Sequence, residues 1–354
     1  MLWDRLQKAA GMTGVLYTIT KSTGASIRKE GRTAYGKRRY NMKYLNEILG
    51  IKYPFIQGGM ANIATGPFAA ACSNAGGLGL IGTGGMNAEM LEEHIAIVRK
   101  ATDKPFGVNL MLMNPDADAM AEICARENIR VVTTGAGNPG KYMGMWKEKG
   151  IFVIPVAASV ALAKRMVKAG ADAVIAEGSE SGGHIGDMTT MTLVPQMVEA
   201  VDVPVIAAGG IATGKQLAAA YMLGACGAQI GTVLLASDEC PIHENYKQAV
   251  IDAKDNSTTV TGRSVNAPVR VIKNNMTRNY LKAEKEGATL EELEMFTLGS
   301  LRKAVFDGNT KEGSLMAGQV CGQVDSIRPV AQIFADLMSE AREAADGLTS
   351  AAFL

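Results

Sequence analysis

Eight short apolar runs recur along the chain at intervals of 20 to 32 residues. The segments between them carry apolar residues at helical spacing, as in residues 88–102 and 214–225. Near-continuous apolar strands that alternate with amphipathic helices are typical of parallel β-strands buried on both faces. The runs cover residues 53–59, 77–82, 105–111, 129–135, 151–156, 171–178, 203–210 and 227–232.

The number of these units favours an α/β protein with a closed (β/α)8 TIM barrel over an open doubly wound sheet. A Rossmann domain would carry G-x-G-x-x-G after its first strand, whereas this chain has "QGGMAN" there. The alternation stops after residue 232, where the chain becomes more polar and suggests helices joined by loops. We therefore predict a barrel over residues 42–232 and a smaller, mostly helical cap over 233–325, on the carboxyl-terminal mouth of the barrel. A last amphipathic helix is predicted over 326–345, with a tail to residue 354.

The first 41 residues differ from the rest in charge. They hold nine Lys and Arg against two acidic residues, whereas residues 42–354 hold 27 basic and 33 acidic ones. The segment suggests a disordered tail, or a transit peptide because it is basic and poor in acids. We favour a third interpretation, a non-native extension from a misplaced start, because Met42 opens a stretch typical of an N-terminus. The mildly acidic remainder argues against a nucleic-acid-binding protein.

The amino-acid composition limits the class of protein and the compartment that can be expected. Apolar residues make up 47% and charged residues 20% of the chain, which is ordinary for a globular protein. The longest apolar stretch, residues 151–163, is too short to cross a bilayer, so we expect no membrane partner. The five cysteines contain no C-x-x-C and predict reduced thiols of a cytoplasmic protein, with neither disulfides nor a metal site. They are Cys72, Cys124, Cys226, Cys240 and Cys321.

The carboxyl-terminal strand ends are where such a barrel carries its chemistry. Two adjacent ends are rich in glycine, "AAGGIATG" (207–214) after the seventh strand and "QIGT" (229–232) after the eighth. Bare backbone N–H groups at a helix start bind phosphate well, because no side chain stands in the way. The alternative is that these glycines only form tight turns. Their occurrence on both neighbouring strands favours a phosphate site.

A third strand end, "AEGSESGGHIG" (176–186), places one of the three histidines among four glycines. So many glycines in one loop are costly to order and predict a close approach to another group. A lone histidine is more often structural than catalytic, and we interpret His94 and His243 in that way. For His184 the glycine setting favours a role in a site.

These motifs together resemble the nitronate monooxygenase superfamily, and more closely its flavin-dependent enoyl-acyl carrier protein reductase II. They are "YPFIQGGMA" (53–61), "AGGLGLIG" (75–82), "DKPFGVNLML" (103–112), "VVTTGAGNP" (131–139), the three glycine-rich segments above and "GSLMAGQVCG" (313–322). The resemblance covers residues 42–340 and implies a TIM barrel with one non-covalent FMN. It implies a phosphate at Gly209, Gly210, Gly231 and Thr232. The ring would lie near Gly59, Met60, Ala61, Asn109, Glu177, Gly182, Gly183, Gln229 and Ile230, with His184 as the catalytic residue.

The activity that the resemblance implies is reduction of a trans-2-enoyl-acyl carrier protein by NADH or NADPH, the last step of the fatty-acid elongation cycle. A bound flavin can take the electrons first and pass them on after the nicotinamide has left, so the two substrates need not share a narrow site. His184 would polarise the thioester or protonate its α-carbon, and its chemistry suits either role. The partner would be acyl carrier protein, and the resemblance also implies a homodimer.

Two other functions remain open at this point. A nitronate monooxygenase would share the fold and the flavin, but its better-known class typically has Gln at the position of Glu177, and often Pro at Gly58 or Gly59. The second is a flavin-binding protein without turnover. A basic cluster in the cap is either a solvated helical face or a dock for an acidic carrier protein. Its members are Arg263, Arg270, Lys273, Arg278, Lys282 and Lys285.

Overall fold

Eight parallel strands form the centre of the protein, paired in the order β1-β9-β8-β6-β5-β4-β3-β2. The computed structural model describes residues 43–351, with side-chain surroundings as far as residue 348. The strands are β1 (Phe55–Gln57), β2 (Gly79–Gly82), β3 (Phe106–Met111), β4 (Val131–Gly135), β5 (Phe152–Ala157), β6 (Val174–Glu177), β8 (Val205–Ala208) and β9 (Ala228–Ile230).

Hydrogen bonds between β1 and the residue before β2 close this sheet into a ring. The Gln57 N–H donates to the Leu78 carbonyl at 2.9 Å, and the Leu78 N–H donates to the Phe55 carbonyl at 2.8 Å. Each predicted strand is present and all pair in parallel, so the predicted (β/α)8 barrel is confirmed. The open-sheet alternative is excluded.

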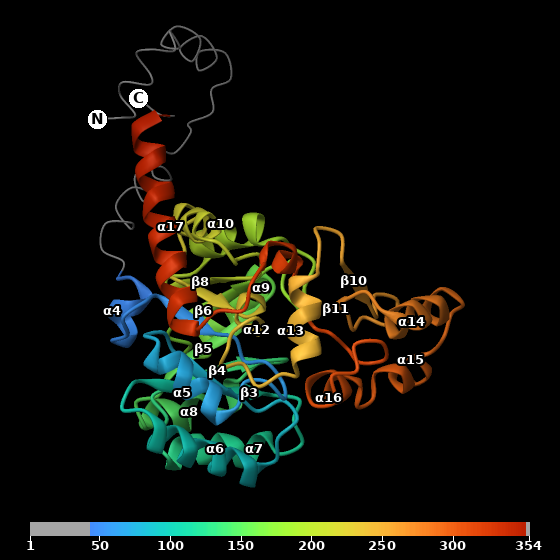
Figure 1. The fold of residues 1–354 in the computed structure, drawn as a ribbon. Helices are drawn as coiled ribbons and strands as arrows, with labels where there is room; N and C mark the ends of the chain where they lie inside the picture. Colours follow the sequence, from blue (N-terminus) through green and yellow to red (C-terminus); the bar gives the residue numbers. More distant parts are fainter. Residues whose placement is uncertain (1–42, 352–354) are drawn as a thin grey trace, which may run out of the picture. The chain divides into compact units, whose positions relative to one another are not determined.

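Helices follow the barrel strands in turn (Figure 1). Local capping explains where several of them begin: the Ser159 side chain accepts the Leu162 N–H at the start of α9, and Thr213 and Gln216 form a capping box at α11. The helices are α5 (Gly66–Asn74), α6 (Ala88–Ala101), α7 (Ala117–Arg126), α8 (Gly140–Glu148), α9 (Val160–Lys168), α10 (Thr190–Ala200), α11 (Gly214–Met222) and the short α12 (Thr232–Leu235).

Alternation along the strands separates two apolar cores. Ile56, Leu80, Val131, Ile154 and Ile175 fill the inside of the barrel, whereas the residues between them along the strands pack against the helices. Helix α4 (Leu45–Leu49) adds its two buried leucines to the inner core, and the N–H of Leu45 donates to the Cys226 carbonyl, two residues before β9, at 2.9 Å. One end of the barrel is thereby closed, which leaves the carboxyl-terminal ends of the strands for a site.

Residues 233–325 contain strands as well as helices. They form α13 (Glu244–Ile251), β10 (Thr258–Thr261), β11 (Val269–Ile272), α14 (Asn275–Lys285), α15 (Leu290–Thr297), α16 (Ser300–Val305) and the 3-10 helix η3 (Gln319–Gln323). The hairpin of β10 and β11 was not expected from the sequence, because each strand has only four residues and thus too few to show a period of two. In Figure 1, α14, α15 and α16 lie together beside this hairpin, on one side of the barrel.

The last helix, α17 (Val330–Ala351), begins later and ends later than the predicted 326–345. It packs against α11, where the Glu340 carboxylate accepts the N–H of Gly214 at 2.7 Å. The predictions for residues 1–41, and the tail from 352, lie outside the described residues. None of the helices within 43–351 is long and apolar enough to cross a membrane.

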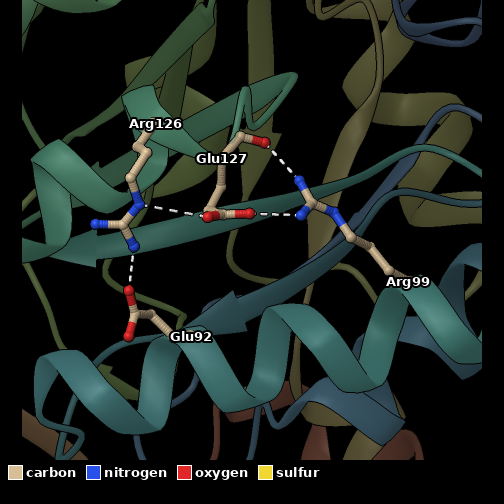
Figure 2. Close-up of polar contacts among 4 residues, drawn as sticks. All are labelled: Glu92, Arg99, Arg126 and Glu127. Atoms are coloured by element: carbon tan, nitrogen blue, oxygen red, sulfur yellow. Dashed lines mark hydrogen bonds and ion pairs between the residues drawn. The ribbon is translucent and has the colours of Figure 1, made fainter.

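A surface network joins two neighbouring helices of the outer ring. Arg99 of α6 contacts both the carboxylate and the carbonyl of Glu127 just after α7, and Arg126 bridges Glu127 to Glu92 (Figure 2). The side chains are partly exposed, and exposed ion pairs contribute little to stability. The network therefore links α6 to the end of α7 without adding much to the stability of the helix layer.

Candidate active site

Polar side chains form a layer at the carboxyl-terminal mouth, directly above the inner apolar core. Thr133 and Glu177 lie two residues beyond Val131 and Ile175 and therefore share their inward face. Asn109 is paired with Thr133 across β3 and β4, and its side-chain amide donates to the Thr133 hydroxyl at 2.8 Å. The barrel thus changes from apolar to polar at the level where its strands end.

Gln229 belongs to this layer but lacks a complete set of partners. It lies between Ala228 and Ile230, which both pack in the outer core, so its side chain faces inward. Its buried Oε1 and the buried Ser181 hydroxyl have no hydrogen-bond partner among residues 43–351. Buried polar atoms are nearly always satisfied, so these two atoms point to a group that binds here. The side chain of Ile230, by contrast, is turned away from the mouth, and only its backbone reaches the rim.

The glycine-rich ends of β8 and β9 present backbone N–H groups beside each other. Gly209 and Gly210 have φ of 87° and 74°, in the left-handed region that glycine adopts without strain. Within the described part of the chain, the N–H groups of Gly209, Gly210 and Gly231 donate to no protein acceptor. Free amides in a loop of this conformation suit an anion.

A distant segment, residues 316–319, completes this side of the mouth. The Gly318 N–H donates to the Thr232 hydroxyl at 2.8 Å, and the Gln319 N–H donates to the Glu180 carbonyl at 2.9 Å. A Cβ on Gly318 would lie 2.6 Å from that same carbonyl, so only glycine fits. The motif at 313–322 therefore joins the loop after β6 to the loop after β9.

The opposite side of the mouth is formed by the residues after β1. A Cβ on Gly59 would overlap the Asn109 side chain, so the chain passes very close to the end of β3. The Met60 sulfur would lie 3.6 Å from a Cβ on Gly231, and a Cβ on Gly84 would lie 2.7 Å from that of Ala61. Gly59, Met60 and Ala61 consequently lie between the ends of β3 and β9, where the sequence predicted them to meet a ligand.

His184 lies in a short strand, β7 (Gly183–His184), which pairs antiparallel with β11. Its partner is Val269, and the next N–H, of Ile185, donates to the Pro268 carbonyl at 3.1 Å. The side chain of His184 is exposed. The cap hairpin therefore holds the histidine at the rim, a support that the sequence did not reveal.

The glycines around His184 approach other protein segments. A Cβ on Gly182 would lie 2.7 Å from the Ala317 carbonyl carbon, and one on Gly186 would lie 2.5 Å from the Ala158 Cβ. Gly178 leaves room in the same way for Thr190. The predicted close approach is thus present, and the structure supplies protein neighbours for these three positions.

Two titratable groups of the mouth have shifted pKa values. Burial raises the pKa of Glu177 to about 7, without a contribution from a charged neighbour. His184 is exposed at the rim, but the atoms packed around it desolvate its ring in part and lower its pKa, which favours the neutral imidazole. A buried carboxyl that titrates near neutral pH and an imidazole whose neutral form is favoured are typical of catalytic sites.

The other two histidines have structural roles. His94 accepts the N–H of Gly66 at 2.9 Å and so caps α5 from the neighbouring helix. His243 accepts the N–H of Asn245 at 3.1 Å at the start of α13. Both contacts agree with the interpretation of these residues as structural.

The basic cluster of the cap separates into one buried and five exposed residues. Arg270 is only 7% exposed and hydrogen-bonds to Ser179 and Thr258, so it is not part of a docking face. The exposed members are Arg263, Lys273, Arg278, Lys282 and Lys285. Arg278, Lys282 and Lys285 follow one face of α14 at helical spacing.

Comparison with known proteins identifies the family. A profile of the nitronate monooxygenase family matches residues 42–340. The chain belongs to this family. FabK from Thermotoga maritima, a solved structure, is 46% identical with a TM-score of 0.84, over 87% of this chain and 99% of FabK.

Two curated relatives of this nitronate monooxygenase family member differ in the activity that their names give. A (3aS,4S,5R,7aS)-5-hydroxy-7a-methyl-1-oxo-octahydro-1H-indene-4-carboxyl-CoA dehydrogenase from Rhodococcus jostii is 30% identical, over 86% of this chain and 97% of its own. A probable nitronate monooxygenase from Staphylococcus saprophyticus is 33% identical, over 77% of this chain and 90% of its own. The family and its solved members are flavin-dependent oxidoreductases, which supports a flavin cofactor in this chain.

Sequence reasoning missed three contributors to the mouth. Thr133 holds Asn109, the Ser181 hydroxyl is buried without a partner, and Arg270 binds the loop that carries His184. Thr133 could have been found from the inward alternation of β4. Arg270 belongs to a hairpin that the pattern does not predict, and the burial of Ser181 depends on the folded loop after β6 rather than on a local pattern.

Proposed function

We propose that this protein is an FMN-dependent enoyl-acyl carrier protein reductase that uses NADH or NADPH. The observation that carries the proposal is the arrangement of the mouth. Free amides after β8 and β9 and an exposed histidine at the rim surround buried polar atoms without partners. The 46% identity to FabK, whose name denotes the enoyl-acyl carrier protein reductase II of the resemblance, supports the same activity.

The residues of the mouth fit an FMN. The N–H groups of Gly209, Gly210 and Gly231, with the hydroxyl of Thr232, would hold its phosphate. The unpaired Gln229 Oε1 and Ser181 hydroxyl are suited to polar edges of the ring or to the ribityl chain. The remaining proposed contacts are Gly59, Met60, Ala61, Asn109, Glu177, Gly182, Gly183 and the backbone of Ile230.

A bound flavin supplies two-electron chemistry, accepting hydride from the nicotinamide and passing it to the enoyl group. Reduction of a conjugated thioester builds negative charge on the thioester oxygen, and a hydrogen-bond donor there lowers the barrier. His184 is exposed at the rim and, with its pKa lowered, is neutral at pH 7 and still donates one N–H. We assign it to polarising that oxygen. Glu177 is partly protonated near neutral pH and can hold a proton at the base of the mouth.

The proposed substrate reaches the site on acyl carrier protein. The exposed basic face of α14 would attract an acidic carrier, and the five cysteines are buried and free, as expected for a protein of the cytoplasm. A homodimer, a cap at 233–325 and a non-native origin of residues 1–41 are further proposals that rest on the sequence.

An anaerobic assay tests the function. Purified protein should be yellow, its flavin absorbance should bleach with NADH or NADPH, and crotonyl thioester should restore it. His184→Ala should slow the restoration about a hundredfold, as expected for loss of a preorganised donor, and leave bleaching largely intact. A protein that is not reoxidised by the thioester, or a His184→Ala variant with the original rate, would refute the proposal.

The second candidate is nitronate oxidation, favoured by the family match and the Staphylococcus saprophyticus relative. In this case the reduced flavin reacts with oxygen. Turnover of an alkyl nitronate in air, together with no reaction with enoyl thioesters, would establish this activity instead. Colour without either reaction would indicate a flavin-binding protein without turnover.

A further inference from the structure

Arg270 is a buried arginine that binds no carboxylate among the described residues. Its Nε and Nη2 donate to the carbonyl oxygen of Ser179 at 3.0 and 2.9 Å, and its Nη1 donates to the Thr258 hydroxyl at 3.1 Å. Burying a guanidinium costs free energy, which three well-placed hydrogen bonds offset. Because two of these hydrogen bonds go to the Ser179 carbonyl, we infer that the position of the loop that contains Ser179 matters to the protein.

The same residue also holds the other end of the loop. Its backbone pairs with Gly183, the residue before His184. Ser179 is in turn fixed by its own N–H, which donates to the Met188 carbonyl at 2.8 Å. Arg270 therefore binds both ends of the glycine-rich segment 179–183, through its side chain at one end and its backbone at the other.

We propose that Arg270 is a positioning residue that keeps His184 at the rim of the mouth by clamping the loop 179–183. This inference rests on the proposed role of His184. Two of the five residues in the loop are glycine, and Glu180 near its centre is held by Thr190 and Gln319, so the contacts of Arg270 fix the two ends of the loop. The planar fork of arginine reaches one carbonyl with two donors and a strand hydroxyl with a third, which the single ammonium of lysine cannot reproduce.

The test uses the flavin-loaded, full-length protein and the variants Arg270→Met and Arg270→Lys. Arg302→Met is the matched control, an exposed arginine of the cap that stacks on Phe306. Amide hydrogen exchange reports the loop directly. Exchange across residues 179–184 should speed up about ten- to hundredfold in both Arg270 variants, the range expected for loss of hydrogen bonds to a charged group. Exchange in β4 should not change.

Flavin reduction by the nicotinamide and flavin reoxidation by the thioester are then measured separately, because a misplaced His184 should slow reoxidation alone, whereas a damaged fold should slow both. Crotonyl thioester should reoxidise the flavin about ten- to hundredfold more slowly in the Arg270 variants, because a misplaced group loses rate steeply. Bleaching by NADH or NADPH should change less than threefold. The double variant with His184→Ala should be no slower than His184→Ala alone, because Arg270 acts through the histidine.

The outcomes distinguish this inference from the proposed function. If His184→Ala keeps the thioester rate, the role of His184 fails. If His184→Ala is slow while both Arg270 variants exchange and react as the wild type does, the clamp is refuted and the function stands. Should Arg270→Met not fold, Thr258→Val removes the hydroxyl that accepts from Arg270 Nη1, with Thr259→Val on the other face of β10 as control. The clamp would also be refuted if Thr258→Val and Thr259→Val had the same exchange and reoxidation rates and Arg270→Lys had the rates of the wild type.

Discussion

Replacing Glu177 with glutamine should stabilise the flavin-free protein at alkaline pH and leave its stability unchanged in weak acid. Glu177 ends β6 in the mouth, where burial raises its pKa from 4.5 to about 7. The raised pKa means that the folded protein retains a proton which the unfolded chain releases. Glutamine has nearly the same shape and carries no charge, so the substitution removes this dependence on pH.

The sign and the size of the effect follow from proton linkage. Between pH 4.5 and about 7 the folded state binds more protons than the unfolded state, so the free energy of unfolding falls as the pH rises through this interval. A pKa change of this size corresponds to about 3 kcal/mol once both states are ionised. Glu177 as a whole residue keeps part of its surface accessible, so we expect about 1.5 to 3 kcal/mol.

Urea denaturation of the flavin-free wild type and of Glu177→Gln at pH 5, 6, 7 and 8 measures this effect. The difference in free energy of unfolding should be small at pH 5 and should grow in favour of the variant up to pH 8. A difference that is the same at all four pH values would refute the reasoning, because the carboxyl would then titrate alike in both states. A difference that grows in favour of the wild type would show that an unrecognised positive group stabilises the carboxylate.

Three further predictions concern the barrel. Gly210→Ala should weaken FMN binding about tenfold and, because Gly210 has a positive φ, should also lower the free energy of unfolding by about 1 kcal/mol. Gly170, also at positive φ, lies away from the mouth, so Gly170→Ala should lower the free energy of unfolding by a similar amount and leave FMN binding unchanged. Binding titrations measure the first effect and urea denaturation measures the second. Trp146→Phe should lower the free energy of unfolding by about 2 kcal/mol, because the buried indole N–H bonds a carbonyl of α7. Glu340→Ala should cost about 1 to 2 kcal/mol in the same measurement, since its carboxylate accepts the first amide of α11, while Glu343→Ala should cost little because this equally exposed carboxylate accepts from Ser339 of its own helix.

The barrel could be predicted because its pattern is local and repeated. Each strand is a short run that is apolar on both faces, and each following helix has its own apolar face, so eight repetitions leave few other folds. Closure itself is a long-range property, made by hydrogen bonds between β1 and the residue before β2. Only the number of units suggested it.

The cap hairpin could not be predicted in the same way. Its strands have four residues each, and three of the four residues of β10 are threonine, so β10 shows no clear alternation of apolar and polar positions. Their stability comes from pairing with each other and with β7, which is a contact between distant parts of the chain. The sequence pattern consequently placed Arg270 of β11 in one basic cluster with exposed residues of the cap, although Arg270 is buried.

In the candidate site, too, some features follow from the local sequence and others from contacts between distant parts of the chain. The glycine-rich strand ends were visible in the sequence, because residues that follow a barrel strand must lie at the mouth. What they touch was not visible: Gly182 lies against Ala317, and His184 pairs with Val269. The histidine is therefore held by elements from outside the barrel, so a change in the cap can move His184 without touching the strand ends proposed to bind the flavin. Variation in the cap, with the barrel kept, is thus a route by which members of one flavin-binding family could come to act on different substrates.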